Sequence, residues 1–126
     1  ISMDFLPTLL AMAGGDVKKA GTFDGIDLSA QLTGKVAPFD RTLYWRFRAN
    51  GQAALRQGDW KYLMLGGKEH LFNLAQDERE RADRAPDDPA RLKAMRLQWD
   101  SWNAQMLAYS LGSYSEDVRD HYSDRY

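Results

Sequence analysis

Three tight-turn signals divide residues 41–73 into short segments, and their spacing constrains the fold more than any other feature of the sequence. The signals are Asn50-Gly51, Gly58-Asp59 and Gly66-Gly67. Such pairs are typical of β-hairpin turns, because Gly and Asn tolerate the positive φ angles that tight hairpins require. Parallel neighbours would need crossover connections of about a dozen residues, for which the turns leave no room. The segment therefore predicts a four-stranded antiparallel meander.

The strands predicted from these turns are about Thr42–Arg48, Gln52–Gln57, Trp60–Leu65 and His70–Asn73. The first strand alternates with a period of two, which is the period at which side chains reach one face of a sheet. One face receives Leu43, Trp45 and Phe47, and the other receives Thr42, Tyr44, Arg46 and Arg48.

A long amphipathic helix is predicted after the sheet, from Pro89 to about Tyr109. Asp88 suits its N-cap and Pro89 its first turn. Its apolar residues recur every three or four positions as Leu92, Met95, Trp99, Trp102, Met106 and Tyr109. A coiled coil is the alternative, but the stripe is shorter than three heptads, so we expect the helix to pack across the sheet. Sheet and helix together predict an α+β fold.

The N-terminal part predicts a helix over residues 2–13 and a connector over residues 16–40. Within the connector, Asp24-Gly25-Ile26-Asp27-Leu28 is interpreted as a turn in which Gly25 supplies a positive φ. Ser29 is then expected to cap a one-turn helix that ends near Leu32. Asp24 and Asp27 could also be read as a cation site, but the spacing lacks the further oxygen ligands of a calcium loop.

Charge and composition exclude several classes of function. The formal net charge of the 126 residues is -1, which argues against broad electrostatic binding to nucleic acid or to an anionic membrane. The sequence has no cysteine, which excludes disulfides, a thiolate zinc site and a cysteine nucleophile. No apolar run approaches the roughly 20 residues that span a bilayer. The lack of cysteine does not identify the compartment, so a periplasmic, a secreted and a cytoplasmic location are all compatible with the sequence.

Basic residues on neighbouring predicted strands are the candidates for a binding site. Arg46, Arg48, Arg56 and Lys61 could form a cationic face suited to a sulfate or carboxylate group, or an ordinary solvated sheet face. The two histidines, His70 and His121, are far apart and have no metal-ligand spacing. A structural or solvated role for His70 is favoured over a catalytic one.

Several short motifs, in order, resemble the C-terminal region of sulfatases, which belong to the alkaline phosphatase superfamily. The chain has Asp4-Phe5-Leu6-Pro7-Thr8-Leu9-Leu10 before Ala13-Gly14, then Asp24-Gly25-Ile26-Asp27-Leu28, Arg41-Thr42-Leu43-Tyr44-Trp45, Ala54-Leu55-Arg56-Gln57-Gly58-Asp59-Trp60-Lys61-Tyr62, and Leu71-Phe72-Asn73-Leu74 with Asp77 and Glu80. Each motif is weak alone, but their order and separation fit the family from residue 1 to about 105. One departure is Glu78, which stands where the family usually has Pro.

The resemblance implies an arylsulfatase-like parent that hydrolyses sulfate esters. Sulfatases use a formylglycine, made from Cys or Ser in C/S-x-P-x-R, and a divalent cation, usually calcium. This chain has neither Cys nor an S-x-P-x-R motif, so we expect the fragment to be inactive and assign it no catalytic or metal role. At most, we expect an edge of the parent's substrate pocket at Arg46, Arg48, Arg56, Lys61 and His70.

The resemblance also implies a division of the chain. Residues 1–40 would be the tail end of the catalytic domain and a connector, residues 41–109 the C-terminal subdomain, and residues 110–126 a tail of unknown role. The expected partner is the catalytic domain of the same parent, with a homodimer through exposed apolar surface as a second expectation. Alternatives are a standalone module for an acidic ligand or carbohydrate, and a related phosphate or phosphonate ester hydrolase.

Overall fold

The computed structural model describes residues 1–47 and 51–108. The chain divides into two compact units, one of residues 1–39 and one that begins at Asp40, and each is described by itself. The fold is α+β, as predicted, with a four-stranded antiparallel sheet followed by a helix. Arg48, Tyr109 and the tail 110–126 lie outside the described residues.

The N-terminal unit consists of short helices. A 3-10 turn, η1 (Ser2–Asp4), leads into α1 (Phe5–Met12), and α2 (Val17–Ala20) and α3 (Ser29–Leu32) follow. The predicted helix 2–13 therefore begins with a 3-10 turn. The prediction missed α2, which begins because the Asp16 side chain accepts hydrogen bonds from two backbone N–H groups in the first turn of α2.

Two buried polar side chains hold the loop before α3. Asp4 Oδ1 accepts a hydrogen bond from the backbone N–H of Ile26 at 3.0 Å, and Thr8 Oγ1 accepts one from Leu28 at 2.9 Å. Asp4 is 2% exposed and Thr8 is 5% exposed, so both bonds lie in a dry environment. The loop therefore takes its shape from helix side chains that are about 20 residues away in sequence.

Gly25 is required for a different reason from the one predicted. Its φ is not positive, so the prediction of a left-handed turn residue was wrong. A Cβ at this position would instead lie 2.0 Å from the carbonyl oxygen of Met3, because the two backbones pass in direct contact. The predicted Ser29 cap was also wrong. Ser29 is the first residue of α3, and the Asp27 carboxylate accepts its N–H at 2.8 Å.

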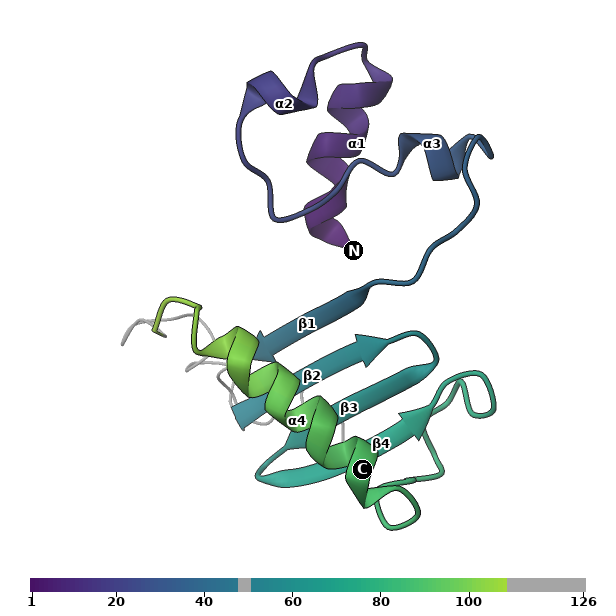
Figure 1. The fold of residues 1–126 in the computed structure, drawn as a ribbon, viewed down its shortest axis with the longest axis vertical. Coiled ribbons are helices and arrows are strands. Elements are labelled where there is room, and N and C mark those ends of the chain that lie inside the picture. Colours follow the sequence, from purple (N-terminus) through teal and green to yellow (C-terminus); the bar gives the residue numbers. More distant parts are fainter. Residues whose placement is uncertain (48–50, 109–126) are drawn as a thin grey trace. The chain divides into compact units, whose positions relative to one another are not determined.

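The second unit contains the predicted meander (Figure 1). Its strands are β1 (Thr42–Phe47), β2 (Gln52–Gln57), β3 (Trp60–Leu65) and β4 (Lys68–Asn73), paired antiparallel in the order β1-β2-β3-β4. The turn glycines 51, 58, 66 and 67 all have positive φ, as hairpin turns require. The fourth strand begins two residues earlier than predicted, directly after Gly66-Gly67.

Helix α4 (Pro89–Asn103) lies across one face of the sheet (Figure 1). Asp88 caps it as predicted, accepting the N–H of Arg91 at 2.9 Å. The helix ends at Asn103, six residues before the predicted end at Tyr109, so Met106 lies beyond it. The part of the stripe that is confirmed is Leu92, Met95, Trp99 and Trp102.

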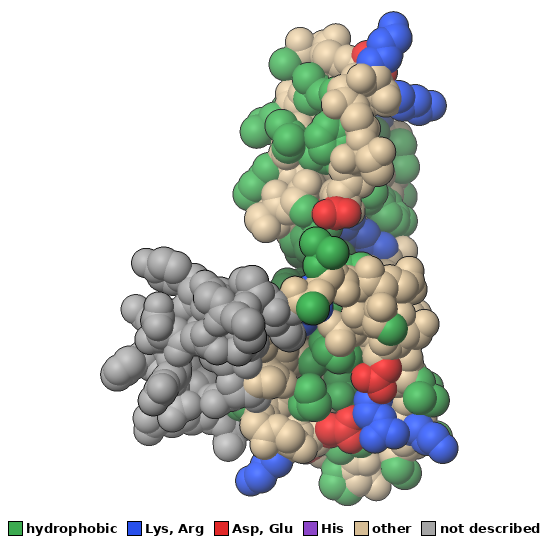
Figure 2. All heavy atoms as spheres, turned by 90° about the vertical axis from the view of Figure 1, so that its left-hand side faces the viewer, with side chains coloured by type: hydrophobic (Ala, Val, Ile, Leu, Met, Phe, Trp, Pro, Cys, Tyr) green, Lys and Arg blue, Asp and Glu red, His purple; other side chains and the backbone are tan. Residues whose placement is uncertain are grey.

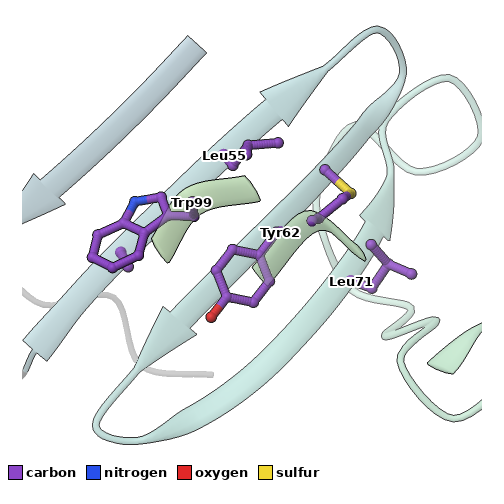
Figure 3. Packing of buried hydrophobic residues seen from close by; sticks show 6 residues of the cluster. Leu55, Tyr62, Leu71 and Trp99 are labelled. Carbon is purple, nitrogen blue, oxygen red and sulfur yellow. The ribbon is translucent and has the colours of Figure 1, made fainter. Parts of the chain in front are cut away.

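The core lies between this helix and three of the strands. Leu55, Tyr62 and Leu71 are directly opposite one another on β2, β3 and β4, and their side chains meet Met95 and Trp99 (Figure 3). Burial and a hydrogen bond to Glu69 raise the pKa of Tyr62 well above its ordinary value. Tyr62 therefore stays a neutral hydrogen-bond donor within this core.

Aromatic contacts fix the C-terminal half of α4 to strand β1. The indole N–H of Trp99 donates to the carbonyl oxygen of Trp45 at 3.0 Å. Tyr44 stacks on Trp102 with ring centroids 4.8 Å apart. Such contacts stabilise the fold beyond the effect of burying apolar area, and they fix the position of the helix along the strand.

Candidate functional site

The two faces of the sheet separate the predicted site residues. Residues directly opposite one another on paired strands point to the same side, so the register assigns every side chain to a face. We call the side that packs on α4 the helix face and the other side the far face. The far face carries Leu43, Trp45, Phe47, Gln52, Ala54, Arg56, Lys61, Leu63, Leu65, Lys68, His70 and Phe72.

Arg46 lies on the helix face, apart from Arg56, Lys61 and His70. Its guanidinium donates to Asn103 Oδ1 at 3.1 Å and to the backbone carbonyl of Leu107. One acceptor is the side chain of the last residue of α4, and the other is a backbone carbonyl four residues beyond it. The contacts of Arg46 therefore give it a structural role at the end of α4. Arg48, predicted for the same face, lies outside the described residues.

Arg56 and Lys61 lie together on the far face, opposite each other on β2 and β3. Arg56 Nε donates to the carbonyl oxygen of Gly58 at 3.2 Å. Lys61 Nζ donates to both carboxylate oxygens of Glu80, at 2.6 and 2.8 Å. The Lys61 and Glu80 side chains are 23% and 17% exposed, so this ion pair is largely screened from solvent.

Glu80, the acid that pairs with Lys61, belongs to the loop after β4. Asp77, which belongs to the same motif as Glu80, accepts the backbone N–H groups of Arg81 and Ala82 at 2.6 and 2.7 Å. The hydrogen bond from Ala82, followed by others from the loop backbone, lowers the pKa of Asp77. Glu80 has a φ of 55°, in the left-handed region that non-glycine residues seldom adopt. The motif acids therefore shape this loop and direct Glu80 to Lys61.

His70 is paired with a second acid of the loop. Its Nδ1 lies 2.8 Å from Asp83 Oδ2. Asp83 Oδ1 also accepts the N–H of Leu71 at 3.0 Å, and the N–H of Arg84 donates to the Leu71 carbonyl at 2.7 Å. Partial burial favours the protonated form of Asp83, but these backbone bonds and His70 outweigh it and lower its pKa. His70 therefore helps to hold the loop along the outer edge of β4.

The described residues do not assemble the predicted cationic face. Lys61 and His70 contact carboxylates, and Arg46 lies on the opposite side of the sheet from Arg56. Within residues 1–47 and 51–108, no group of three or more His, Asp or Glu side chains could hold a metal ion. Among the same residues, none of the helices has the length and hydrophobicity of a membrane span.

An apolar hollow on the far face was missed by the sequence analysis. It measures about 310 Å³ and is lined by Trp45, Arg46, Phe47, Gln52, Ala53, Ala54 and Leu63. Trp45 and Phe47 beside it are 40% and 41% exposed. Ala54 is directly opposite Trp45 on β1 and Leu63 on β3, so a small side chain stands between two large ones. The sequence shows the sizes of these three residues, but it does not show which of them are opposite one another. The hollow could therefore be found only with the strand register.

No protein-family model and no curated protein matches the chain. Solved structures do match its fold. Ps i-CgsB, solved in complex with k-i-k-neocarrahexaose, has a TM-score of 0.68 and 27% identity over 91% of this chain. BT33336S-sulf, from glycosaminoglycan metabolism in Bacteroides thetaiotaomicron, has a TM-score of 0.64 and 19% identity over 81%. The phosphonate monoester hydrolase of Agrobacterium radiobacter has a TM-score of 0.52 and 24% identity over 82%.

The chain resembles the C-terminal region of sulfatases. The sulfatase-like region matches only 27%, 24% and 25% of the lengths of the three solved proteins, so it spans about a quarter of each. Its sulfatase-like motifs have structural explanations in the described residues. Asp4 and Thr8 hold the Gly25 loop, and Glu80 pairs with Lys61.

Proposed function

We propose that this chain is the C-terminal subdomain of a sulfatase, and that the parent protein hydrolyses a sulfate ester. The observation that carries the proposal is the match to Ps i-CgsB, which covers 91% of this chain at 27% identity but only 27% of that protein. A match of this kind supports a module within a larger enzyme. Since Ps i-CgsB was solved with a neocarrahexaose, a sulfated oligosaccharide is the first substrate class to test for the parent.

In this proposal the catalytic groups belong to the rest of the parent. A sulfatase parent would use a formylglycine and a divalent cation, calcium being the usual one. The residues of this chain do not fit either group, because the sequence has neither cysteine nor an S-x-P-x-R motif and the described residues lack a cluster of metal-binding side chains. We therefore assign no step of the reaction to them.

The role proposed for the chain itself is docking against the catalytic domain. Helix α1 exposes four apolar side chains, Phe5, Leu6, Leu9 and Met12, at 68%, 63%, 62% and 58%. None of the residues of α1 is charged. Hydrophobic side chains are visible on the surface of this unit in Figure 2. Contiguous apolar surface of this kind is typical of an interface. A homodimer that covers the same surface is the competing expectation when the chain is alone.

Two alternatives make different demands on the site. A standalone module for acidic ligands needs convergent free cations, and the pairing of Lys61 with Glu80 and of His70 with Asp83 speaks against it. A phosphonate monoester hydrolase parent is favoured by one match, with a TM-score of 0.52. We rank it second because the match to Ps i-CgsB has both a higher TM-score and a higher identity.

The experiment begins with the gene that encodes these residues. A reading frame that continues upstream into a C/S-x-P-x-R motif is expected. The full-length protein with calcium should release sulfate from a chromogenic aryl sulfate or a sulfated oligosaccharide, and the 126-residue chain alone should not. A full-length protein that hydrolyses phosphonate monoesters but no sulfate ester would refute the sulfatase proposal. Turnover by the isolated chain would refute the proposed division of labour.

A further inference from the structure

A pocket on the helix face lies between the turn that joins β2 to β3 and the N-terminal half of α4. Its volume of about 590 Å³ falls within the range of roughly 300–1,000 Å³ that is typical of small-molecule sites. Gln57 and Trp60 are directly opposite each other beside the turn, and α4 supplies the other wall. The lining includes Gln57, Trp60, Asp88, Arg91, Ala94 and Gln98.

Arg91 is held in place at this pocket with most of its donors unused. Its guanidinium carbon lies 4.2 Å from the centroid of the Trp60 ring, and its Nε donates to Asp88 Oδ2 at 2.8 Å. Among the described residues, none accepts a hydrogen bond from Nη1 or Nη2. The two terminal nitrogens therefore offer a planar pair of donors whose side chain is already ordered, which lowers the entropy cost of binding.

Two glutamine amides complete the polar part of the lining. Gln98 Nε2 donates to the Tyr44 hydroxyl at 3.2 Å, which leaves the Gln98 carbonyl oxygen as an acceptor. Gln57 is exposed, and its side chain makes no hydrogen bond to a residue that the structure describes. An amide group both donates and accepts hydrogen bonds. The pocket therefore combines donors and acceptors with the apolar surface of Trp60.

The charges of the lining indicate the class of ligand. Arg91 and Asp88 form an ion pair, and hydrogen bonds from the backbone and the side chain of Arg91 lower the pKa of Asp88. Asp88 therefore stays ionised, and the two charges cancel. An anion such as sulfate would lose water and meet the Asp88 carboxylate beside its cation. A hydroxyl group donates and accepts without charge, so a ring that carries several hydroxyl groups fits this lining better.

We infer that this pocket binds an uncharged sugar unit of a saccharide, with Arg91 Nη1 and Nη2 donating to its hydroxyl groups and the amides of Gln57 and Gln98 bonding to others. The inference goes beyond the proposed function, because the second unit forms the pocket by itself. Binding here does not depend on which ester the parent hydrolyses.

Isothermal titration calorimetry of the full-length protein with unsulfated hexasaccharides of glucose, galactose and mannose tests the inference. At least one should bind with a millimolar or tighter dissociation constant. Ala94→Trp, which fills the pocket from an exposed position of α4, should abolish that binding. Arg91→Lys keeps the charge but loses the planar pair of donors, so it should weaken binding by about tenfold or more. Ser101→Trp adds the same ring to α4 outside the lining and should bind normally.

The two pocket variants together make the result decisive. Arg91 is exposed, so Arg91→Lys remains informative if Ala94→Trp lowers the stability of the protein. Binding that survives both substitutions would overturn the inference, as would the failure of every hexasaccharide to bind. Binding by the 126-residue chain but not by the full-length protein would also overturn it, since the rest of the parent would then cover the pocket.

Heteronuclear NMR of the 126-residue chain locates the ligand. The indole N–H of Trp60 and the Nε–H of Arg91 should shift as the hexasaccharide is added. The indole N–H of Trp99 is the internal control, because it donates to the Trp45 carbonyl and Trp99 lies outside the lining. Inorganic sulfate should leave all three signals in place. Sulfate that shifts the Trp60 and Arg91 signals, with no shift by any hexasaccharide, would show an anion site and overturn the inference.

Failure of this inference differs from failure of the proposed function. A full-length protein that binds a hexasaccharide at Arg91 but releases no sulfate from any sulfate ester would refute the sulfatase proposal alone. An active sulfatase that binds no unsulfated hexasaccharide would refute this inference alone.

Discussion

Gly25→Ala tests how the N-terminal unit holds its loop. The added Cβ would lie 2.0 Å from the carbonyl oxygen of Met3, 2.3 Å from its carbonyl carbon and 2.7 Å from the backbone nitrogen of Asp4. All three are backbone atoms, so no rotamer change can relieve the clash and the loop must move away from η1. The movement breaks the hydrogen bonds from Ile26 to Asp4 and from Leu28 to Thr8.

The cost follows from those two bonds. A hydrogen bond to a carboxylate is worth about 1.5–3 kcal/mol and one to a hydroxyl about 0.5–1.5 kcal/mol. Replacing Gly by Ala also restricts the unfolded chain, which returns about 0.4–1 kcal/mol. We therefore expect a net loss of about 1–4 kcal/mol from the local stability of the unit, or roughly a 5- to 1,000-fold loss of amide protection.

Hydrogen exchange followed at the amides of Ile26 and Leu28 measures this loss residue by residue. Thr8→Val removes one of the same bonds without a clash, so its effect should not add fully to that of Gly25→Ala. Lys18→Ala, an exposed change in α2, is the control and should leave both amides protected. Unchanged exchange in Gly25→Ala would show that the loop tolerates the added Cβ. Full additivity with Thr8→Val would show that the clash leaves the bond from Leu28 to Thr8 intact.

Three further predictions concern the second unit. Trp99→Phe should cost about 1–3 kcal/mol in urea denaturation, because it removes the donor to the Trp45 carbonyl, and an unchanged midpoint would contradict that bond. Glu80→Gln should destabilise by about 1–2 kcal/mol, since it leaves Lys61 partly buried without a counter-charge; Lys61→Met with Glu80→Gln should cost less than the sum of the single changes. The lowered pKa of Asp83 means that its carboxylate contributes stability above the pKa of about 3.9 in the unfolded chain, and loses it as pH falls through the folded pKa. Asp83→Asn should flatten the acid limb of stability measured between pH 7 and pH 3, and an unaltered limb would refute the assignment.

Local rules made the sheet predictable. Each hairpin turn contains glycine with a positive φ, and the residues between turns alternate, so strand bounds followed from single positions. The register needed more. A two-residue turn at Asn50-Gly51 would have paired Arg46 with Leu55, whereas the structure pairs it with Ala53. Both registers place Arg46 and Arg56 on opposite faces, so the division of the predicted cationic face was already determined by alternation.

Contacts between distant segments were not predictable from one sequence. Nothing local connects Asp4 with Ile26, and the reason for Gly25 is a backbone that lies elsewhere in the chain. The partners of Lys61 and His70 come from a charged loop whose course no period describes. The end of α4 was overestimated because the apolar spacing of Met106 continues the stripe, although the helix ends at Asn103.

The covered edge of β4 has a consequence for assembly. Leu71 has its N–H bonded to Asp83 and its carbonyl bonded to Arg84, and on the opposite strand of the sheet the Trp45 carbonyl is taken by Trp99. Each outer strand thus has backbone polar groups occupied by its own chain, which hinders the addition of a foreign strand. When many copies of the chain are close together, we therefore expect them to associate through their exposed side chains. Fibres that grow by adding strands to the edges of the sheet should be disfavoured.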